Sequence, residues 1–178
     1  MFKVINEDLD LKKIADSGQC FRMKEQEDGS WLIIAGSRYC TAAGNDAVTF
    51  LCPDEDDAFW KDYFDLDTDY ASFRRSVDTG DAFLSVAAEY GKGIRILRQD
   101  PWEMLITFII SQRRSIPSIK TCVERLCERW GRKLYGCIYA FPDPYELSCA
   151  SLDELCCCGL GYRAEYVYLA VKMTSQYN

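Results

Sequence analysis

Two pairs of neighbouring residues have the chemistry for contact with a nucleic acid. Arg113 and Arg114 lie between two apolar runs, where two guanidinium groups could bind a phosphate. Tyr162 and Arg163 follow a glycine, and a flat ring beside a forked cation can stack on a base and read its edge. Either pair alone is equally compatible with a polar loop or a helix cap, so each pair needs its structural context.

Other chemistries are excluded or disfavoured. The chain contains no histidine, which excludes Ser-His and Cys-His catalytic pairs and imidazole metal ligands within it. Cys156, Cys157 and Cys158 are adjacent and no CxxC pair occurs among the ten cysteines, so packed reduced thiols are favoured over a metal site. No apolar run is long enough to span a membrane.

Charge is unevenly distributed along the 178 residues. The net charge is −7, which on average disfavours binding to DNA. Residues 1–99 contain 12 basic and 19 acidic side chains, whereas residues 100–178 contain 9 of each. Residues 113–133 contain seven basic and two acidic side chains. The basic segment therefore overlaps the Arg113-Arg114 pair.

The first half of the chain reads as short strands. Segments 20–26, 31–35, 39–43 and 47–52 are rich in aromatic or β-branched residues and are separated by turn formers, which predicts an antiparallel meander. The acidic, aromatic stretch 54–69 predicts a helix that buries Phe59, Trp60, Tyr63 and Phe64. We expect residues 1–98 to form one β-rich domain.

The second half reads as helices. Asp100, Pro101 and Glu103 form a helix start, followed by an apolar run buried on most sides. A second helix opens near Ser115 and presents an apolar stripe: Ile116, Ile119, Val123, Leu126 and Trp130. A short helix at 151–157 and a last helix running almost to residue 178 complete a partial helical domain, 99–178. The fold class is α+β.

Three stretches taken together identify a family resemblance. They are SGQCFR at 17–22, GIRILRQDPWE at 93–103 leading through FIISQ to VERLC, and LGYRA at 160–164. This set resembles the front part of the 8-oxoguanine DNA glycosylases of the helix-hairpin-helix superfamily. The resemblance implies a sheet like that of the TATA-binding protein, followed by the first helices of an all-α glycosylase domain.

The resemblance also implies a function in base-excision repair. Family enzymes flip the oxidised guanine out of the duplex, attack its glycosidic carbon with a lysine assisted by an aspartate, and cleave the strand as an AP lyase. No metal or organic cofactor is implied. The implied partner is damaged double-stranded DNA, and we expect a DNA-associated monomer in the cytoplasm, or in the nucleus of a eukaryote.

Individual residues follow from the matched motifs. Gly18 matches the glycine whose carbonyl accepts the N7–H of 8-oxoguanine, Tyr162 the ring that wedges into the base stack, and Arg163 the arginine that reads the widowed cytosine. Arg113 and Arg114 occupy the place of the family's asparagine-rich turn. Its later arginine falls on Ser118, and Met23 replaces an aromatic residue, so these positions depart from the pattern.

The catalytic hairpin and its lysine have no match in this sequence, and Lys172 is not assigned to that role. We therefore interpret the chain as the front part of a longer glycosylase/AP lyase, with recognition residues and no catalytic ones. The alternatives are a free-standing, non-enzymatic DNA-binding module and a protein-interaction domain whose last helix docks onto a partner.

The absence of a match to the catalytic lysine leads to a first prediction. The chain alone should show neither glycosylase nor lyase activity, because no covalent intermediate can form without the nucleophile. Borohydride trapping with an oligonucleotide that contains 8-oxoguanine opposite cytosine tests this expectation. A trapped adduct on the 178-residue chain would show that another amine acts as nucleophile.

Overall fold

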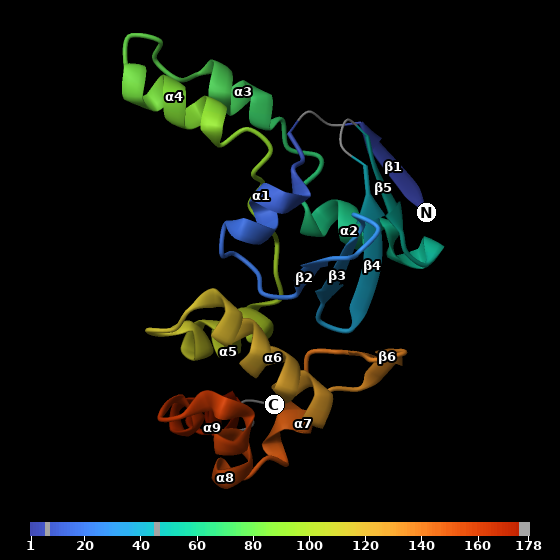
Figure 1. Cartoon of the computed structure of the whole chain (residues 1–178), viewed down its shortest axis with the longest axis vertical. Coiled ribbons are helices and arrows are strands. Elements are labelled where there is room, and N and C mark those ends of the chain that lie inside the picture. Colours follow the sequence, from blue (N-terminus) through green and yellow to red (C-terminus); the bar gives the residue numbers. More distant parts are fainter. Residues whose placement is uncertain (6–7, 45–46, 175–178) are drawn as a thin grey trace. The chain divides into compact units, whose positions relative to one another are not determined.

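The computed structural model describes residues 1–5, 8–44 and 47–174, and the chain divides into two compact units (Figure 1). The first unit comprises Met1–Ile33 and Cys40–Arg98, and the second comprises Ile34–Tyr39 and Gln99–Asn178. The end predicted for the last helix, near residue 178, lies outside the described residues.

A five-stranded sheet has the strand order β1-β5-β4-β3-β2, and most of its residues belong to the first unit, while the turn between β3 and β4 and the adjoining strand ends belong to the second. Its strands are β1 (Phe2–Ile5), β2 (Met23–Glu25), β3 (Trp31–Ala35), β4 (Arg38–Ala43) and β5 (Ala47–Leu51). The antiparallel sheet confirms the predicted fold class. Sequence reasoning missed β1, which pairs with β5 so that Phe2 lies opposite Phe50 and their rings stack at 4.8 Å.

Short helices complete this unit: α1 (Leu11–Asp16), the 3₁₀ turn η1 (Asp54–Asp56), α2 (Asp57–Tyr63), α3 (Tyr70–Arg75) and α4 (Ala82–Tyr90). The predicted aromatic helix is α2. Trp60, Tyr63 and Phe64 are buried, and the ring of Phe64 lies 5.2 Å from that of Phe50. This contact joins the helix to the apolar face of the sheet.

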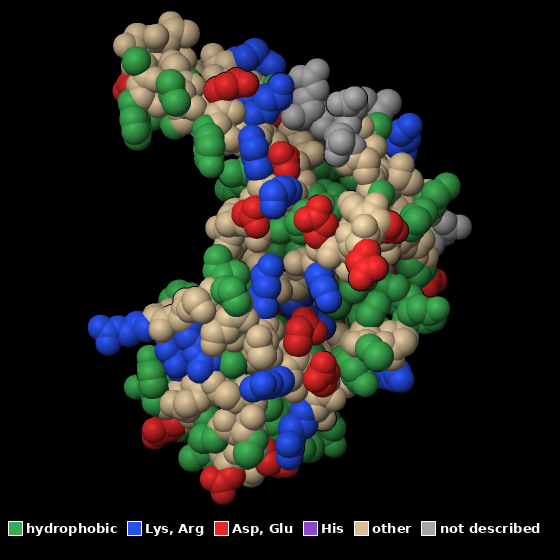
Figure 2. Space-filling view, in the orientation of Figure 1, with side chains coloured by type: hydrophobic (Ala, Val, Ile, Leu, Met, Phe, Trp, Pro, Cys, Tyr) green, Lys and Arg blue, Asp and Glu red, His purple; other side chains and the backbone are tan. Residues whose placement is uncertain are grey.

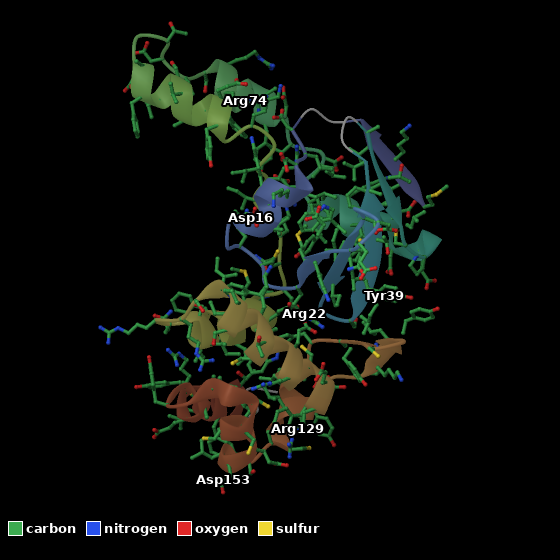
Figure 3. All side chains as sticks on the ribbon, in the orientation of Figure 1. Asp16, Arg22, Tyr39, Arg74, Arg129 and Asp153 are labelled. Carbon is green, nitrogen blue, oxygen red and sulfur yellow. The ribbon has the colours of Figure 1, made fainter. Side chains whose placement is uncertain are left out.

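A buried arginine organises the loops around α2. Arg95 is fully buried and donates to the backbone carbonyls of Phe64 (2.9 Å), Thr68 (2.8 Å), Asp8 (3.2 Å) and Asp65. Burial lowers the pKa of Arg95, opposed by the nearby Tyr70, Asp65 and Asp8. Arg74 of α3, labelled in Figure 3, forms an ion pair with the buried Asp8 carboxylate.

The second unit is mainly helical. Its elements are α5 (Pro101–Ser111), α6 (Ile116–Trp130), β6 (Lys133–Tyr135), β7 (Ile138–Tyr139), α7 (Pro144–Ser148), α8 (Leu152–Leu155), the π-helical turn η2 (Cys156–Leu160) and α9 (Arg163–Thr174). The predicted helix start at Asp100 is confirmed, because its carboxylate accepts the Glu103 amide hydrogen at 2.9 Å and Pro101 occupies the first turn.

Two expectations about burial in this unit are wrong in part. The buried stripe of α6 contains Ile119, Val123 and Leu126, but Ile116 is exposed. Cys122 and Cys127 are buried beside the stripe instead, because thiols behave as small apolar groups. The apolar run of α5 is not covered on most sides, since one of its faces is exposed to solvent.

Half of the cysteines are buried packing residues: Cys20, Cys40, Cys122, Cys127 and Cys158. All ten lie within the described residues and none is bridged. Burial raises the pKa of Cys52 to about 11 and also raises that of Cys158, so these thiols stay protonated at neutral pH. Over the described part of the chain, no helix has the length and apolarity to cross a membrane.

The carbonyl cage of Arg95 generates a stability prediction. Arg95→Met should lower the free energy of unfolding by about 3 kcal/mol or more, because each buried acceptor left unpaired costs about 1–3 kcal/mol. Urea unfolding followed by tryptophan fluorescence measures the loss. The matched control is Arg98→Met, whose guanidinium is exposed and pairs with Asp62 and Asp65, and it should cost about 0–1 kcal/mol. Equal losses in the two variants would contradict this account.

Candidate nucleic-acid interface

The guanidinium of Arg163 connects the start of α9 to the turn between α5 and α6. Arg163 is buried, and its Nε donates to the Gln112 carbonyl at 2.8 Å, a carbonyl that Nη2 also contacts. Its Nη1 reaches the Leu160 carbonyl at 3.4 Å, and Nη2 lies 3.5 Å from the Arg113 carbonyl. Arg163 thus fixes two chain segments that are fifty residues apart in the sequence.

Tyr162 lies beside this buried cation but remains accessible. Its ring centroid is 4.3 Å from the guanidinium carbon of Arg163, within the range of a cation–π contact. The ring also meets Tyr166 edge-on, at 6.2 Å between centroids. Tyr162 is 59% exposed, so one aromatic face is held in place while part of the ring stays open to a ligand.

The two arginines of the α5–α6 turn have different environments. Arg113 has a φ of +53° and an exposed side chain. Arg114 is half-buried and donates to the Gly159 carbonyl and to Cys122 Sγ, the latter at 2.6 Å. Figure 2 shows basic side chains projecting near this turn. Arg113 is therefore the one of the pair that is presented to solvent, while Arg114 holds the turn against η2.

Glycine is required where η2 meets this turn. Gly159 has a φ of +83°, which strains any residue with a Cβ. A Cβ at this position would also lie 3.3 Å from Arg125 Nη1 and 3.5 Å from Cys122 Sγ. The positive φ is the main reason for glycine here, because 3.5 Å is an ordinary contact and the end of the Arg125 side chain can move.

An exposed ion pair ties α8 to α6. Arg129 of α6, labelled in Figure 3, donates to the Glu154 carboxylate at 2.6 Å. Glu154 also accepts the amide hydrogen and the hydroxyl of Ser151, both at 2.9 Å, in a capping box. The hydrogen bonds from the Ser151 backbone and from the Arg129 side chain lower the pKa of Glu154 to about 2.

Gly18 lies in the other unit, in the turn that follows α1. The strand predicted at 20–26 is shorter in the structure, because β2 begins only at Met23. Gly18 has a φ of +79° directly after the C-cap Ser17, the usual place for a glycine that ends a helix. The next residue, Gln19, donates to the Arg95 carbonyl at 2.9 Å and accepts the Leu97 amide hydrogen at 3.0 Å.

The structure therefore brings together four of the five predicted contact residues in the second unit: Tyr162, Arg163, Arg113 and Arg114. Their roles on DNA stay predictions. Sequence reasoning missed Gln112, Gly159 and Gln19. Gln112 and Gly159 act through backbone carbonyls, which leave no side-chain signature. The Gly159-x-Gly161 pair was the one available signal, since paired glycines mark an unusual turn.

Comparisons with known proteins match this arrangement. The family model described as the N-terminal domain of 8-oxoguanine DNA glycosylase matches residues 1–105. An N-glycosylase/DNA lyase of Saccharomyces cerevisiae is 42% identical over 84 residues, which cover 43% of this chain and 22% of the relative. The N-glycosylase/DNA lyase OGG1 of Arabidopsis thaliana is 27% identical over 177 residues, which cover 93% of this chain and 48% of the relative.

A solved structure resembles almost the whole chain. The 8-oxoguanine glycosylase/lyase of Clostridium acetobutylicum, in complex with double-stranded DNA containing cytosine opposite 8-oxoguanine, matches with a TM-score of 0.88 and 35% sequence identity. The match covers 96% of this chain and 60% of that protein. The chain thus spans half or less of the two curated relatives and about three fifths of this solved homologue.

The capping network of α8 generates a pH prediction. An NMR titration of the Glu154 carboxyl should give a midpoint near pH 2, below the ordinary value of 4.5. Because the folded-state pKa is depressed, the stability contributed by Glu154 is complete above pH 4.5 and is lost as the pH falls through 2. Arg129→Ala should raise the midpoint, whereas Arg132→Ala should leave it in place. A midpoint near 4.5 in the wild-type chain would show that the network does not persist in solution.

Proposed function

The chain belongs to the 8-oxoguanine DNA glycosylase family, and on that premise we propose that it forms the lesion-recognition part of a base-excision repair glycosylase/AP lyase. Its substrate would be duplex DNA in which an oxidised guanine is flipped out of the stack. The observation that carries this proposal is the Arg163 cluster. It gathers a half-exposed tyrosine, a buried arginine and an exposed arginine at one turn, the combination needed to fill and read an emptied base position.

Tyr162 supplies the wedge in this proposal. Its ring is constrained on one side by the Arg163 guanidinium and at its edge by Tyr166. A ring already held in place loses little conformational entropy when it enters a base step, so more of its stacking energy is available to keep the step open. Arg113, at the exposed turn, would contact the phosphate backbone or enter the gap left by the flipped base.

Arg163 reads the widowed base. Cytosine offers two acceptors on its pairing edge, N3 and O2, whereas adenine offers one acceptor and an amino donor. In the unbound state the guanidinium is occupied by the carbonyls of Gln112 and Leu160. Contact with cytosine would replace part of this backbone bonding, so base reading would be coupled to the position of the α5–α6 turn.

Gly18 supplies lesion selectivity from the first unit. The N7 of 8-oxoguanine carries a hydrogen that a backbone carbonyl can accept, whereas the bare N7 of guanine would face that carbonyl as a second acceptor. The clamp that Gln19 makes with the backbone at Arg95 and Leu97 restrains the chain next to Gly18. A restrained carbonyl discriminates better than a mobile one, because it cannot turn away from the repulsive contact.

The charge distribution generates a prediction about affinity. Binding to DNA should be weak and salt-sensitive, and Arg113→Ala should reduce the slope of log K against log salt by about 1. Arg113→Gly should reduce the slope equally but preserve stability, because glycine tolerates the positive φ of this position. Arg114→Ala should instead lower the melting temperature, since it leaves the Gly159 carbonyl without this donor. If the slope in Arg113→Ala matches wild type, the Arg113 side chain points away from DNA.

The test of the proposed function is the preference of the 178-residue chain among three duplexes. Fluorescence anisotropy would compare 8-oxoguanine opposite cytosine, 8-oxoguanine opposite adenine, and guanine opposite cytosine. We expect the tightest binding to 8-oxoguanine opposite cytosine. Equal affinity for all three duplexes would contradict a role in lesion recognition.

Arg163→Ala should reduce the difference in binding affinity between the two 8-oxoguanine duplexes by a factor of about 10 to 100. This is the range expected for the loss of one bidentate base contact. The loss should fall mainly on the duplex with cytosine. Arg132→Ala serves as the control, because this exposed arginine of the same unit lies outside the cluster. Equal weakening on both lesion duplexes by Arg163→Ala would leave Arg163 as a positioning residue for the turn.

A further inference from the structure

Two cysteines of the first unit face each other across neighbouring strands of the sheet. The register of β4 and β5, which lie side by side in Figure 1, pairs Thr41 with Leu51. Extending this register by one residue sets Cys40 opposite Cys52, the residue that follows β5. Residues directly opposite in an antiparallel pair have Cα atoms about 4.5–5.5 Å apart, and a disulfide spans about 4.4–6.8 Å. The backbone therefore already holds the two cysteines at a separation that a disulfide can bridge.

Both thiols lie on the buried face of the sheet. Side chains alternate between the two faces of a strand, so Cys40 shares its face with Ala42, and Cys52 shares its face with Phe50. Ala42, Phe50 and Cys40 are fully buried, whereas Cys52 is half-buried at the strand end. The pair thus combines one thiol that solvent can reach with one that it cannot.

The two thiols also influence each other electrostatically. Burial raises the pKa of Cys40, and the Cys52 thiol raises it further, as expected for two acidic groups that lie close together. Cys52 Sγ lies 3.3 Å from Oδ1 of Asp57, the first residue of α2, and donates its hydrogen to that oxygen. The pair is therefore located where the chain leaves the sheet to form α2.

A metal site would be another use of neighbouring thiols. A structural zinc site needs four ligands. Within the part of the chain that the structure describes, no group of three or more histidine, cysteine, aspartate or glutamate side chains could hold an ion. The adjacent Cys156 and Cys157 of η2 are exposed and follow each other along one turn, so strand register does not pair them. The geometry therefore favours a covalent bond between Cys40 and Cys52.

We propose that Cys40 and Cys52 form a reversible disulfide by exchange with a small-molecule disulfide. The Cys52 thiolate, on the accessible side chain, attacks one sulfur of the oxidant, breaks its sulfur–sulfur bond and expels one small thiolate. The Cys40 thiolate then attacks the Cys52 sulfur and expels the second small thiolate. Two protein thiols are oxidised, and one small disulfide is reduced to two thiols. The two cysteine protons pass through solvent to the expelled thiolates.

The surroundings of Cys52 make this exchange slow. Burial and the hydrogen bond to Asp57 raise the pKa of Cys52 to about 11. The charges of Asp57 and Asp56 act in the same direction, and the N-terminal amine opposes them. The attacking thiolate is therefore scarce at neutral pH, and the exchange should become faster as the pH rises. The pair responds to sustained oxidising conditions rather than to a brief exposure.

The disulfide would stabilise the first unit. It fastens β4 to β5 at the end of the sheet from which the chain continues into α2. In the unfolded chain it closes residues 40–52 into a loop, which removes conformational freedom from that state. The oxidised chain should therefore resist unfolding better than the reduced chain.

Peptide mapping of the wild-type chain tests for the bond. Trypsin releases residues 39–61 as one peptide, and Cys40 and Cys52 are its only cysteines. The chain is incubated with oxidised glutathione at mildly alkaline pH, and the remaining thiols are alkylated. We expect the peptide without alkyl groups and two hydrogen atoms lighter than its reduced form, and treatment with dithiothreitol should restore both thiols. A peptide alkylated at both cysteines, or one that keeps glutathione on Cys52, would overturn the proposal.

Thermal unfolding tests the consequence. Oxidation should raise the melting temperature of the wild-type chain by about 5 °C. Cys52→Ser should abolish this rise, because it removes the bond while its hydroxyl can still donate to Asp57. The matched control is Cys149→Ser, at an exposed cysteine of the second unit, and it should keep the rise. A rise that persists in Cys52→Ser would place the stabilising bond elsewhere and overturn the proposal. No DNA is present, so the result is independent of lesion recognition.

Discussion

The bonding of the Arg163 guanidinium to backbone carbonyls is the interaction on which the candidate interface depends. Gln112 ends α5 and Leu160 ends η2, and carbonyls at helix C-termini have no intrahelical partner. These ends also carry the negative pole of the helix dipole, which favours a cation. Arginine suits the position because it stays charged and offers several donors in a rigid fork. One side chain thereby binds the free carbonyls at two helix ends and holds the Tyr162 ring in place.

The first unit uses the same device. Arg95 satisfies the carbonyls of Phe64, Asp65 and Thr68 after α2, together with that of Asp8 before α1. The Gln19 side chain, next to Gly18, donates to the Arg95 carbonyl and accepts the amide hydrogen of Leu97. In both units, therefore, a buried guanidinium caged by carbonyls lies beside the turn that carries a candidate contact residue. This arrangement gives irregular backbone a fixed geometry without regular secondary structure.

An element could be predicted from the sequence when the residues that stabilise it lie close together along the chain. The start of α5 was predictable because Asp100, Pro101 and Glu103 act on their own turn. Strand β1 was missed because its four residues gain stability from β5, more than forty residues away. The family motifs located Tyr162 and Arg163. The groups that Arg163 binds could not be predicted, because they are backbone carbonyls, which occur at every residue and leave no signal in the sequence. That Gly18 follows the end of a helix could not be predicted, because the six-residue helix α1 before it was not predicted.

The cage around Arg163 also bears on selectivity. A guanidinium that leaves the Gln112 carbonyl for a base leaves a buried acceptor short of a donor, and such a loss costs about 1–3 kcal/mol. A base with two acceptors facing the fork, such as cytosine, can offset that loss through a bidentate contact, whereas a base with one acceptor and a donor cannot. A freely mobile arginine would not bear this cost and would bind either base more readily, although it would still prefer cytosine. The backbone bonding that looks purely structural in the unbound chain would thus raise the free energy that any base contact must supply, while the preference for cytosine would come from the bidentate contact of the cation.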